Sequence, residues 1–257
     1  MPLIAGAVTL RHRHKIFDFV LLGIVMVAAW QILFWVIGDS ALASPRGTLQ
    51  RLAELFQTKR FWDDVAETLQ AIAVAVLIAV IGGVSFGVIL GMHRRSGDVA
   101  EPLLVTLYSL PKVTLYPVVL LIFGLGISAR IAFGIIHGIF PVVLFAMASI
   151  RNIRPVVWRS AQAFHLSKWQ TITSVIFPAA LPGIMTGVRI GTSVTLLGVL
   201  VGEMFAAKAG VGYRLVNAMA NHDVATILAI ALALTLFALT LNGLLMLIGG
   251  RVNGKKA

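Results

Sequence analysis

Long apolar runs dominate the hydrophobic pattern of this sequence, and short segments that carry most of the charged residues separate them. A helix needs about 20 mostly apolar residues to cross a hydrocarbon core about 30 Å thick. Six segments are long enough, and they are too long and unbroken for the alternating strands of a membrane barrel. The predicted spans are Ile16–Gly38, Val65–Gly91, Val99–Gly124, Ile131–Ile150, Ile184–Phe205 and Thr226–Gly249.

The pattern predicts an all-α membrane protein with one membrane domain over residues 16–249, between short tails at 1–15 and 250–257. The first span is too long for a signal-peptide core, and no small-residue cleavage site follows it, so we expect a retained helix. Pro111 and Lys112 interrupt the third span, which is therefore either a broken helix or a helix after a short lead-in.

Two loops contain predicted helices. In the loop after the first span, Ser44-Pro45 precedes a predicted interfacial helix over Thr48–Lys59. The loop over residues 151–183 carries several cations and predicts two short helices with a turn at His165. Ser167 is the expected N-cap of the second of these, Lys168–Ile176, which Pro178 should end.

Lys and Arg are more frequent in the loops on the side of the N-terminus than in those on the opposite side. Because cytoplasmic loops carry the excess of basic residues, both termini are predicted to be cytoplasmic. We therefore expect a multi-pass membrane protein, with the 151–183 loop facing the cytoplasm.

The amino-acid composition excludes several other classes of protein. The 257 residues are 59% hydrophobic and 12% charged, include no Cys, and give a net charge of +11. So much apolar surface excludes a lone soluble enzyme and a disordered chain, and the lack of Cys excludes a disulfide scaffold or a thiolate metal site. The basic residues lie between apolar runs, so they indicate membrane orientation rather than binding to nucleic acid.

Catalytic motifs are absent from the sequence. The segment Gly249–Lys256 matches a phosphate-binding loop through its lysine, but the required Ser or Thr and the following helix are missing. We therefore interpret it as a basic tail, and we expect no metal site and no cofactor in this chain.

Ionisable residues inside spans are costly and are candidates for function. Lys112 either lines a path or anchors the broken span at the interface. Arg189 either lines a path or extends its side chain to the interface. Glu203 ends the fifth span, and His137 is expected to be a packed core residue.

Two spans carry glycine at every fourth position: Gly83, Gly87 and Gly91 in one, and Gly183, Gly187 and Gly191 in the other. Such stripes let helices approach closely in lipid. We expect them to pack helices within the subunit, with a subunit contact or a path lining as the alternatives.

The cytoplasmic loop resembles the E-A-A-x-x-x-G-x₉-I-x-L-P loop of the membrane permease subunits of ABC importers. The alignment places Arg159, Ser160 and Ala161 on E-A-A and His165 on the glycine, while Val175, Phe177 and Pro178 follow on I, L and P. Arg159 reverses the family's charge at its position. His165 replaces a residue that a turn with positive φ favours, although His tolerates that conformation better than most residues.

The flanking segments strengthen the resemblance, which covers roughly residues 45–250. They are similar to the nitrate, sulfonate and taurine branch of the family. The similar segments are Ser109–Lys112, Tyr116-Pro117, Phe123–Gly126, Lys168–Gln170, Pro178–Gly183, Gly187–Ile190, Gly202–Met204 and Gly210–Tyr213.

The resemblance implies a type I ABC importer permease of a bacterial inner membrane, which forms the path for a small solute, such as a sulfonate, nitrate or another small organic anion. It implies as partners two cytoplasmic ATPase subunits that bind ATP and Mg, a second permease copy, and a periplasmic or lipid-anchored binding protein. Residues expected to couple to the ATPase are Arg159, Ser160, Ala161, Ala163, Phe164, His165, Lys168 and Trp169. Residues expected along the path are Tyr108, Pro111, Lys112, Arg189, Ser193, Glu203 and Met204.

Two other classes of protein have to be weighed against this interpretation. An ATP-independent channel or secondary transporter would also have six spans, but the sequence shows none of the internal repeats that such carriers often have. An intramembrane enzyme would need catalytic groups that are not found here.

Overall fold

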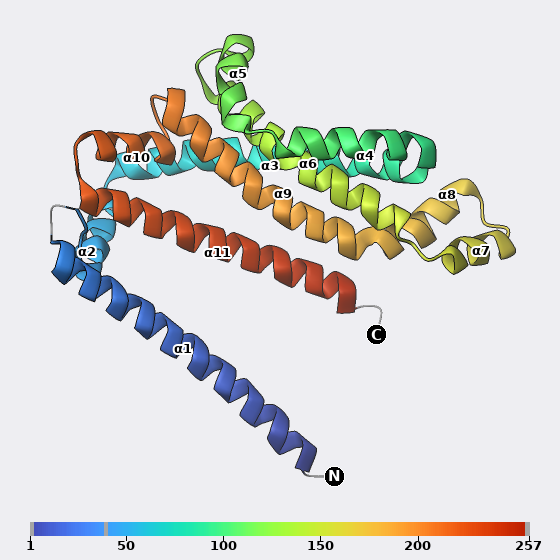
Figure 1. Cartoon of the computed structure of the whole chain (residues 1–257), viewed down its shortest axis with the longest axis horizontal. Helices are drawn as coiled ribbons and strands as arrows, with labels where there is room; N and C mark the ends of the chain where they lie inside the picture. The colour runs from blue at the N-terminus through green and yellow to red at the C-terminus, as the bar shows by residue number, and fades with distance from the viewer. Residues whose placement is uncertain (1–2, 39–40, 255–257) are drawn as a thin grey trace. The chain divides into compact units, whose positions relative to one another are not determined.

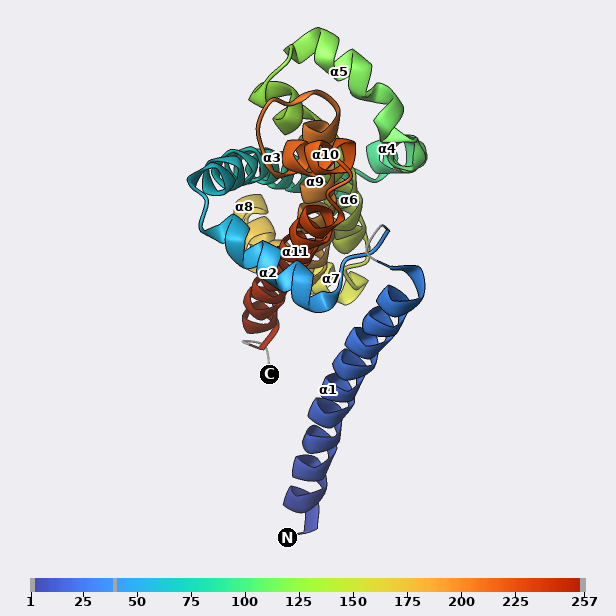
Figure 2. The same cartoon turned by 90° about the vertical axis from the view of Figure 1, so that its left-hand side faces the viewer.

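The computed structural model describes residues 3–38 and 41–254, and every regular element in this part of the chain is helical. The chain's cartoon is shown in Figures 1 and 2. In chain order the helices are α1 (Leu3–Ile37), α2 (Pro45–Phe56), α3 (Lys59–Met92), α4 (Arg94–Ser109), a 3₁₀ turn (Lys112–Leu115), α5 (Tyr116–Phe123), α6 (Ile127–Arg151), α7 (Pro155–Ala163), α8 (Lys168–Gln170), a π-helical segment (Thr171–Ile176), α9 (Phe177–Ala206), α10 (Val211–Ala220) and α11 (Val224–Gly254).

Within the described residues, five helices are long and apolar enough to cross a membrane, and there are six spans if the bent pair Arg94–Ser109 and Lys112–Phe123 counts as one. The six predicted spans fall on these segments. The third is a broken helix, because the two halves meet at 87°. Pro111 has no N–H to continue a helix and disfavours the helical conformation at Leu110, so the chain turns at this point.

The chain forms two compact units. One contains residues 59–216 together with those from 234 onward, and the other contains residues up to 58 together with 217–233. The larger unit holds the helical bundle and the sites discussed below.

The bundle is built around α6, which packs against α3 and α9 (Figures 1 and 2). A methyl group added at Gly83, Gly87 or Gly91 of α3 would lie 2.6–2.8 Å from a Cβ of α6. On the other side, added methyl groups at Gly183, Gly187 and Gly191 of α9 would meet Ser149, Phe145 and Val142 of α6. Both predicted stripes therefore pack helices within the subunit.

His137 occupies the centre of this bundle, as expected of a core histidine. It is 6% exposed, and its Nδ1 lies 2.9 Å from the carbonyl oxygen of Phe133. Its ring packs edge-on against Phe133 and leaves room for no side chain at Gly198, where an added methyl would lie 2.8 Å from the ring. Burial next to a carbonyl acceptor accounts for this histidine without a proton relay.

In the smaller unit, α2 lies where the sequence predicts a helix between the first two spans, but it begins and ends earlier than expected. The side chain of Ser44 caps it by accepting a hydrogen bond from the amide of Gly47. Arg51 of α2 donates to Thr226 and Asp223 at 2.7 and 3.2 Å. Burial by itself would raise the pKa of Asp223. The hydrogen bonds from Thr226 and the positive charge of Arg51 together outweigh this effect, so the pKa of Asp223 lies below its ordinary value.

We expect Gly87→Ala to destabilise the chain by about 1–3 kcal/mol, because the added methyl would lie 2.6 Å from both Ala146 Cβ and the Val143 carbonyl oxygen of α6. Gly82→Ala is the matched control on the same helix, since its methyl would lie 3.6 Å from Ile139 at ordinary contact distance. The midpoint of thermal unfolding in detergent reports the stability of each variant. Equal midpoints for the two would contradict the close approach of α3 and α6.

Candidate functional site

The turn after α7 has the conformation that the sequence predicts. His165 has φ +50°, its amide donates to Gln162, and the amide of Leu166 donates to Ala161. This pair of hydrogen bonds is a Schellman motif, in which the residue one position beyond the cap adopts the left-handed conformation. Glycine adopts it without strain, and His165 adopts it here at a cost of about 1 kcal/mol.

The second helix begins at Ser167 through a reciprocal cap. The Ser167 hydroxyl accepts from the amide of Gln170 at 3.3 Å, and the Gln170 side chain accepts from the amide of Ser167 at 3.0 Å. This is a capping box. Ser167 is thus confirmed as the N-cap of the helix that starts at Lys168.

The prediction that Pro178 ends this helix is wrong. The chain stays helical from Lys168 to Ala206, through α8, the π-helical segment and α9. In the wider π turn the amide of Phe177 donates to Ile172, five residues back, and Pro178 falls in the first turn of α9, where its lack of an N–H is tolerated. The turn at His165 is therefore joined directly to a membrane helix.

The predicted coupling residues surround this turn, where α7 and α8 form a protrusion (Figure 1). Phe164 and Trp169 are 78% and 74% exposed, and Arg159, Ser160, Ala163 and His165 are also exposed. Ala161 is 2% exposed and belongs to the packing of α7, which corrects the expectation that it forms part of an exposed docking face. The side chain of Lys168 lies outside the described residues.

The protrusion is anchored to the bundle by an apolar cluster. Ile153, just before α7, and Val157 on α7 pack with Ile176 and Ala180 at the start of α9 and with Ile150 at the end of α6. Ile150 and Ile176 are at most 2% exposed. The cluster therefore joins α7 to the adjoining ends of α6 and α9.

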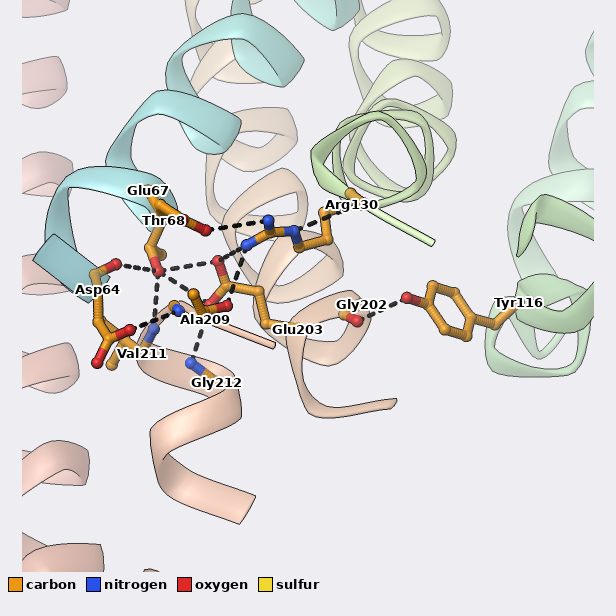
Figure 3. A network of polar contacts seen from close by, with 12 residues as sticks. Asp64, Glu67, Thr68, Tyr116, Arg130, Gly202, Glu203, Ala209, Val211 and Gly212 are labelled. Carbon is orange, nitrogen blue, oxygen red and sulfur yellow. Dashed lines mark hydrogen bonds and ion pairs between the residues drawn. The ribbon is translucent and has the colours of Figure 1, made fainter. Parts of the chain in front are cut away.

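A second group of polar residues lies at the other end of α9, where α3 and α6 begin (Figure 3). Glu203 is completely buried. The hydroxyl of Thr68 lies 2.9 Å from both of its oxygens, the amide of Gly212 donates to it at 2.9 Å, and Arg130 lies 3.3 Å away. A buried carboxylate in an apolar bundle is tolerated only when it is paired and hydrogen-bonded in this way.

The same network holds the loop that follows α9. The carbonyl of Ala209 accepts from Arg130, the amide of Gly210 donates to Asp64, and the amide of Val211 donates to Thr68. Gly210 has φ +108°, and any Cβ there would lie 2.5 Å from the Glu203 carboxylate, so only glycine fits.

Two further ion pairs belong to the network. Arg130 also contacts Glu67 at 3.1 Å, and Arg214 on α10 contacts Asp64 at 2.5 Å. Tyr116 of α5 donates to the carbonyl of Gly202 at 2.6 Å beside this network. The start of α3, the start of α6, the end of α9 and the following loop are thus fixed together.

Glu203 is expected along the path, but in this structure its carboxylate is fully buried within the network. Sequence reasoning missed its partners Asp64, Thr68 and Arg130. The spacing of Asp64 and Thr68 by four residues, at the start of an apolar run, was the available signal, since it puts both side chains on one helix face.

The predicted path residues of the broken span lie at its bend. Lys112 is 8% exposed, and its ammonium donates to the carbonyl of Tyr108 at 2.7 Å, which caps the end of α4. It also lies 4.6 Å from the Tyr108 ring centre and 5.7 Å from that of Phe140. Tyr108 is 37% exposed and Pro111 is exposed.

The remaining path candidates lie along α9. Ser193 donates to Asn242 of α11 at 3.1 Å, and Met204 is half-buried. Arg189 is half-buried and lines a cavity between α9 and α11. The structure therefore does not bring Lys112, Arg189 and Glu203 into one site. Within the described residues, no group of three or more His, Asp or Glu side chains is arranged to hold a metal ion.

Comparison with known proteins identifies the family of this helical bundle. Residues 83–256 match the sequence profile of the binding-protein-dependent transport system inner membrane component. The chain belongs to this family. The permease is 27% identical over 220 residues to the taurine transport system permease protein TauC of Escherichia coli, covering 81% of this chain and 80% of TauC.

Other relatives have similar coverage. A probable ABC transporter permease protein of Haemophilus influenzae is 30% identical over 199 residues, with 77% of this chain and 80% of that protein covered. The nitrate import permease protein NrtB of Synechococcus elongatus is 24% identical over 199 residues, with 74% and 71% covered. These matches confirm the resemblance to the ABC permeases of the nitrate, sulfonate and taurine branch and favour it over an ATP-independent carrier.

The fold also matches a solved structure. A chain from the inward-facing conformations of the MetNI methionine ABC transporter superposes with a TM-score of 0.61, at 18% sequence identity, over 75% of this chain and 94% of that chain. The permease therefore has the expected type I importer fold.

We expect Glu203→Ala to destabilise the permease by about 3–5 kcal/mol, because it leaves Arg130 buried with one partner fewer and the Gly212 amide without an acceptor. Glu54→Ala is the control, since Glu54 forms a surface pair worth less than about 1 kcal/mol. The midpoint of thermal unfolding is measured for both variants. A decrease in midpoint for Glu203→Ala no larger than that for Glu54→Ala would contradict the structural role of the network.

Replacing His165 with glycine should stabilise the turn by about 1 kcal/mol, because glycine adopts positive φ without a clash of its side chain. His165→Val should have the opposite effect, since a β-branched residue is strained there. Hydrogen exchange of the amides from 161 to 170 measures the local effect. Faster exchange in His165→Gly than in the unaltered chain would contradict the observed turn.

Proposed function

We propose that this permease couples ATP hydrolysis by partner subunits to the import of a small anion, through the protrusion over residues 151–178. The observation that carries the proposal is the continuous helix from the capped turn at Ser167 to Glu203. The helix runs for 39 residues from Lys168 to Ala206, on the order of 60 Å along its axis at the α-helical rise. A motion imposed on the turn is transmitted along this helix to the far end of the bundle.

The exposed turn has the chemistry of a docking surface. Phe164 and Trp169 present large aromatic side chains to solvent, and exposed Arg154 and Arg159 flank them. Aromatic and arginine side chains dominate the binding energy of protein interfaces. The complementary partner surface is an apolar cleft with an acidic rim on a cytoplasmic ATPase.

The energy for transport then comes from the partner. Two ATPase subunits bind ATP and Mg, and their closure moves the two docked turns of a permease pair together. The docked turn can switch the path only if the partner contacts it differently in the two states. A periplasmic or lipid-anchored protein delivers the solute outside, and both termini of the permease lie in the cytoplasm.

A small anion is the substrate class that the relatives support, since they are named for taurine, sulfonate and nitrate transport. The ammonium of Lys112 has aromatic neighbours and a single carbonyl acceptor, with no acidic partner among the described residues. An uncompensated cation at the bend of a broken span attracts a passing anion.

Phe164→Ser tests the docking. Because Phe164 is 78% exposed, its replacement should change the stability of the permease by less than about 0.5 kcal/mol. In the assembled transporter it should lower substrate-stimulated ATPase activity at least tenfold, because hot-spot aromatic side chains contribute about 2 kcal/mol or more to binding.

Val156→Ser is the matched control, because Val156 lies on the same helix, is 53% exposed and is two turns from the tip. It should keep most of the stimulated activity. Full stimulation in Phe164→Ser, with the ATPase still co-purifying, would refute docking at this turn.

A further inference from the structure

A cavity of about 230 Å³ lies between α9 and the last turns of α11, within the larger unit. One wall is a face of α9 and the other is a face of α11. The lining residues are Pro182, Met185, Thr186, Arg189, Leu245, Met246, Gly249 and Gly250. The volume is below the range of about 300–1,000 Å³ typical of sites for drug-sized ligands, so it suits a small group.

Among the described residues, Arg189 is the sole charged member of this lining. Its guanidinium makes no hydrogen bond or ion pair with any side chain or carbonyl in the described part of the chain. The other arginines in the bundle behave differently: Arg130, Arg151 and Arg214 each contact a carboxylate. A half-buried guanidinium without an anion is costly, because its five N–H donors are partly removed from water.

The shape of the cavity follows from the two helices. Ser193 and Asn242 join α9 to α11 one turn beyond Arg189, so the cavity is bounded on that side. Gly249 and Gly250 carry no side chain that could occupy the cavity from α11. A methyl group added at Gly250 would meet nothing within 4 Å. The open volume therefore lies between these glycines and the Arg189 side of α9.

We propose that this cavity binds the oxyanion head of a small anionic group, such as a phosphate or a sulfonate. The planar guanidinium of Arg189 holds two oxygens of such a group through paired N–H donors. The hydroxyl of Thr186, which lies on the same wall, donates to the carbonyl of Pro182. The head group belongs either to an anionic lipid at the membrane surface or to a free anion. The free-anion source rests on the proposed function, and the lipid source does not.

The test uses the full-length chain purified in a neutral detergent, without the ATPase. Its thermal unfolding is followed against sodium sulfate, with sodium chloride at matched ionic strength, and against short-chain phosphatidylglycerol, with phosphatidylcholine as its neutral counterpart. Saturable stabilisation by sulfate identifies a free-anion site, and stabilisation by phosphatidylglycerol alone identifies a lipid site. Both outcomes support the proposal.

Four variants make the result specific to the cavity. Arg189→Met should weaken binding about tenfold or more, and Arg189→Lys should retain part of it. Gly250→Leu fills the cavity without removing charge and should weaken binding equally. Gly243→Leu is its control, since Gly243 also lies on α11 and an added methyl there also meets nothing within 4 Å.

No stabilisation by either ligand, or equal affinity in the unaltered chain and in both Arg189→Met and Gly250→Leu, overturns the proposal. If Arg189→Met fails to fold, Gly250→Leu and Gly243→Leu still decide the result. Because no ATPase is present, the outcome is independent of docking at Phe164.

Discussion

The close approach of three helix backbones is the constraint on which the rest of the permease depends. Lipid tails are as apolar as leucine, so burial alone does not drive membrane helices together, and packing and polar contacts must do so. Glycine stripes on α3 and α9 allow both helices to touch α6 along its length. Without that contact, the buried groups at the two ends of α6 would not meet their partners.

The helices of the bundle are held together by different kinds of contact at its two ends. At one end the contacts are apolar, with Ile150 and Ile176 joining α6, α7 and α9. At the other end they are ionic and directional, with Glu203 and Arg130 joining α3, α6 and α9. Apolar contacts permit sliding, whereas a satisfied buried network has one favoured geometry. The protrusion is thus held by apolar contacts, and the opposite end of α9 is held in one arrangement by its ionic network.

The sequence alone predicted the spans, the turn at His165 and the cap at Ser167, because each depends on local chemistry. Apolar length, a residue that tolerates positive φ and a capping hydroxyl are visible in a single stretch of chain. The environment of Glu203 was not predictable in this way, since its partners lie on helices distant in sequence. The continuation of the helix through Pro178 also escaped prediction, because the rule that proline ends helices assumes α geometry in the preceding turn.

The π-helical segment Thr171–Ile176 absorbs one residue while keeping the helix on its two sides in register. An α-helix advances about 100° per residue, and a π turn accommodates one residue more than an α turn. Deleting one residue from this segment would restore α geometry and leave the exposed aromatic tip on the same side of α9. Relatives with and without the surplus residue would therefore present the tip to a partner in the same orientation.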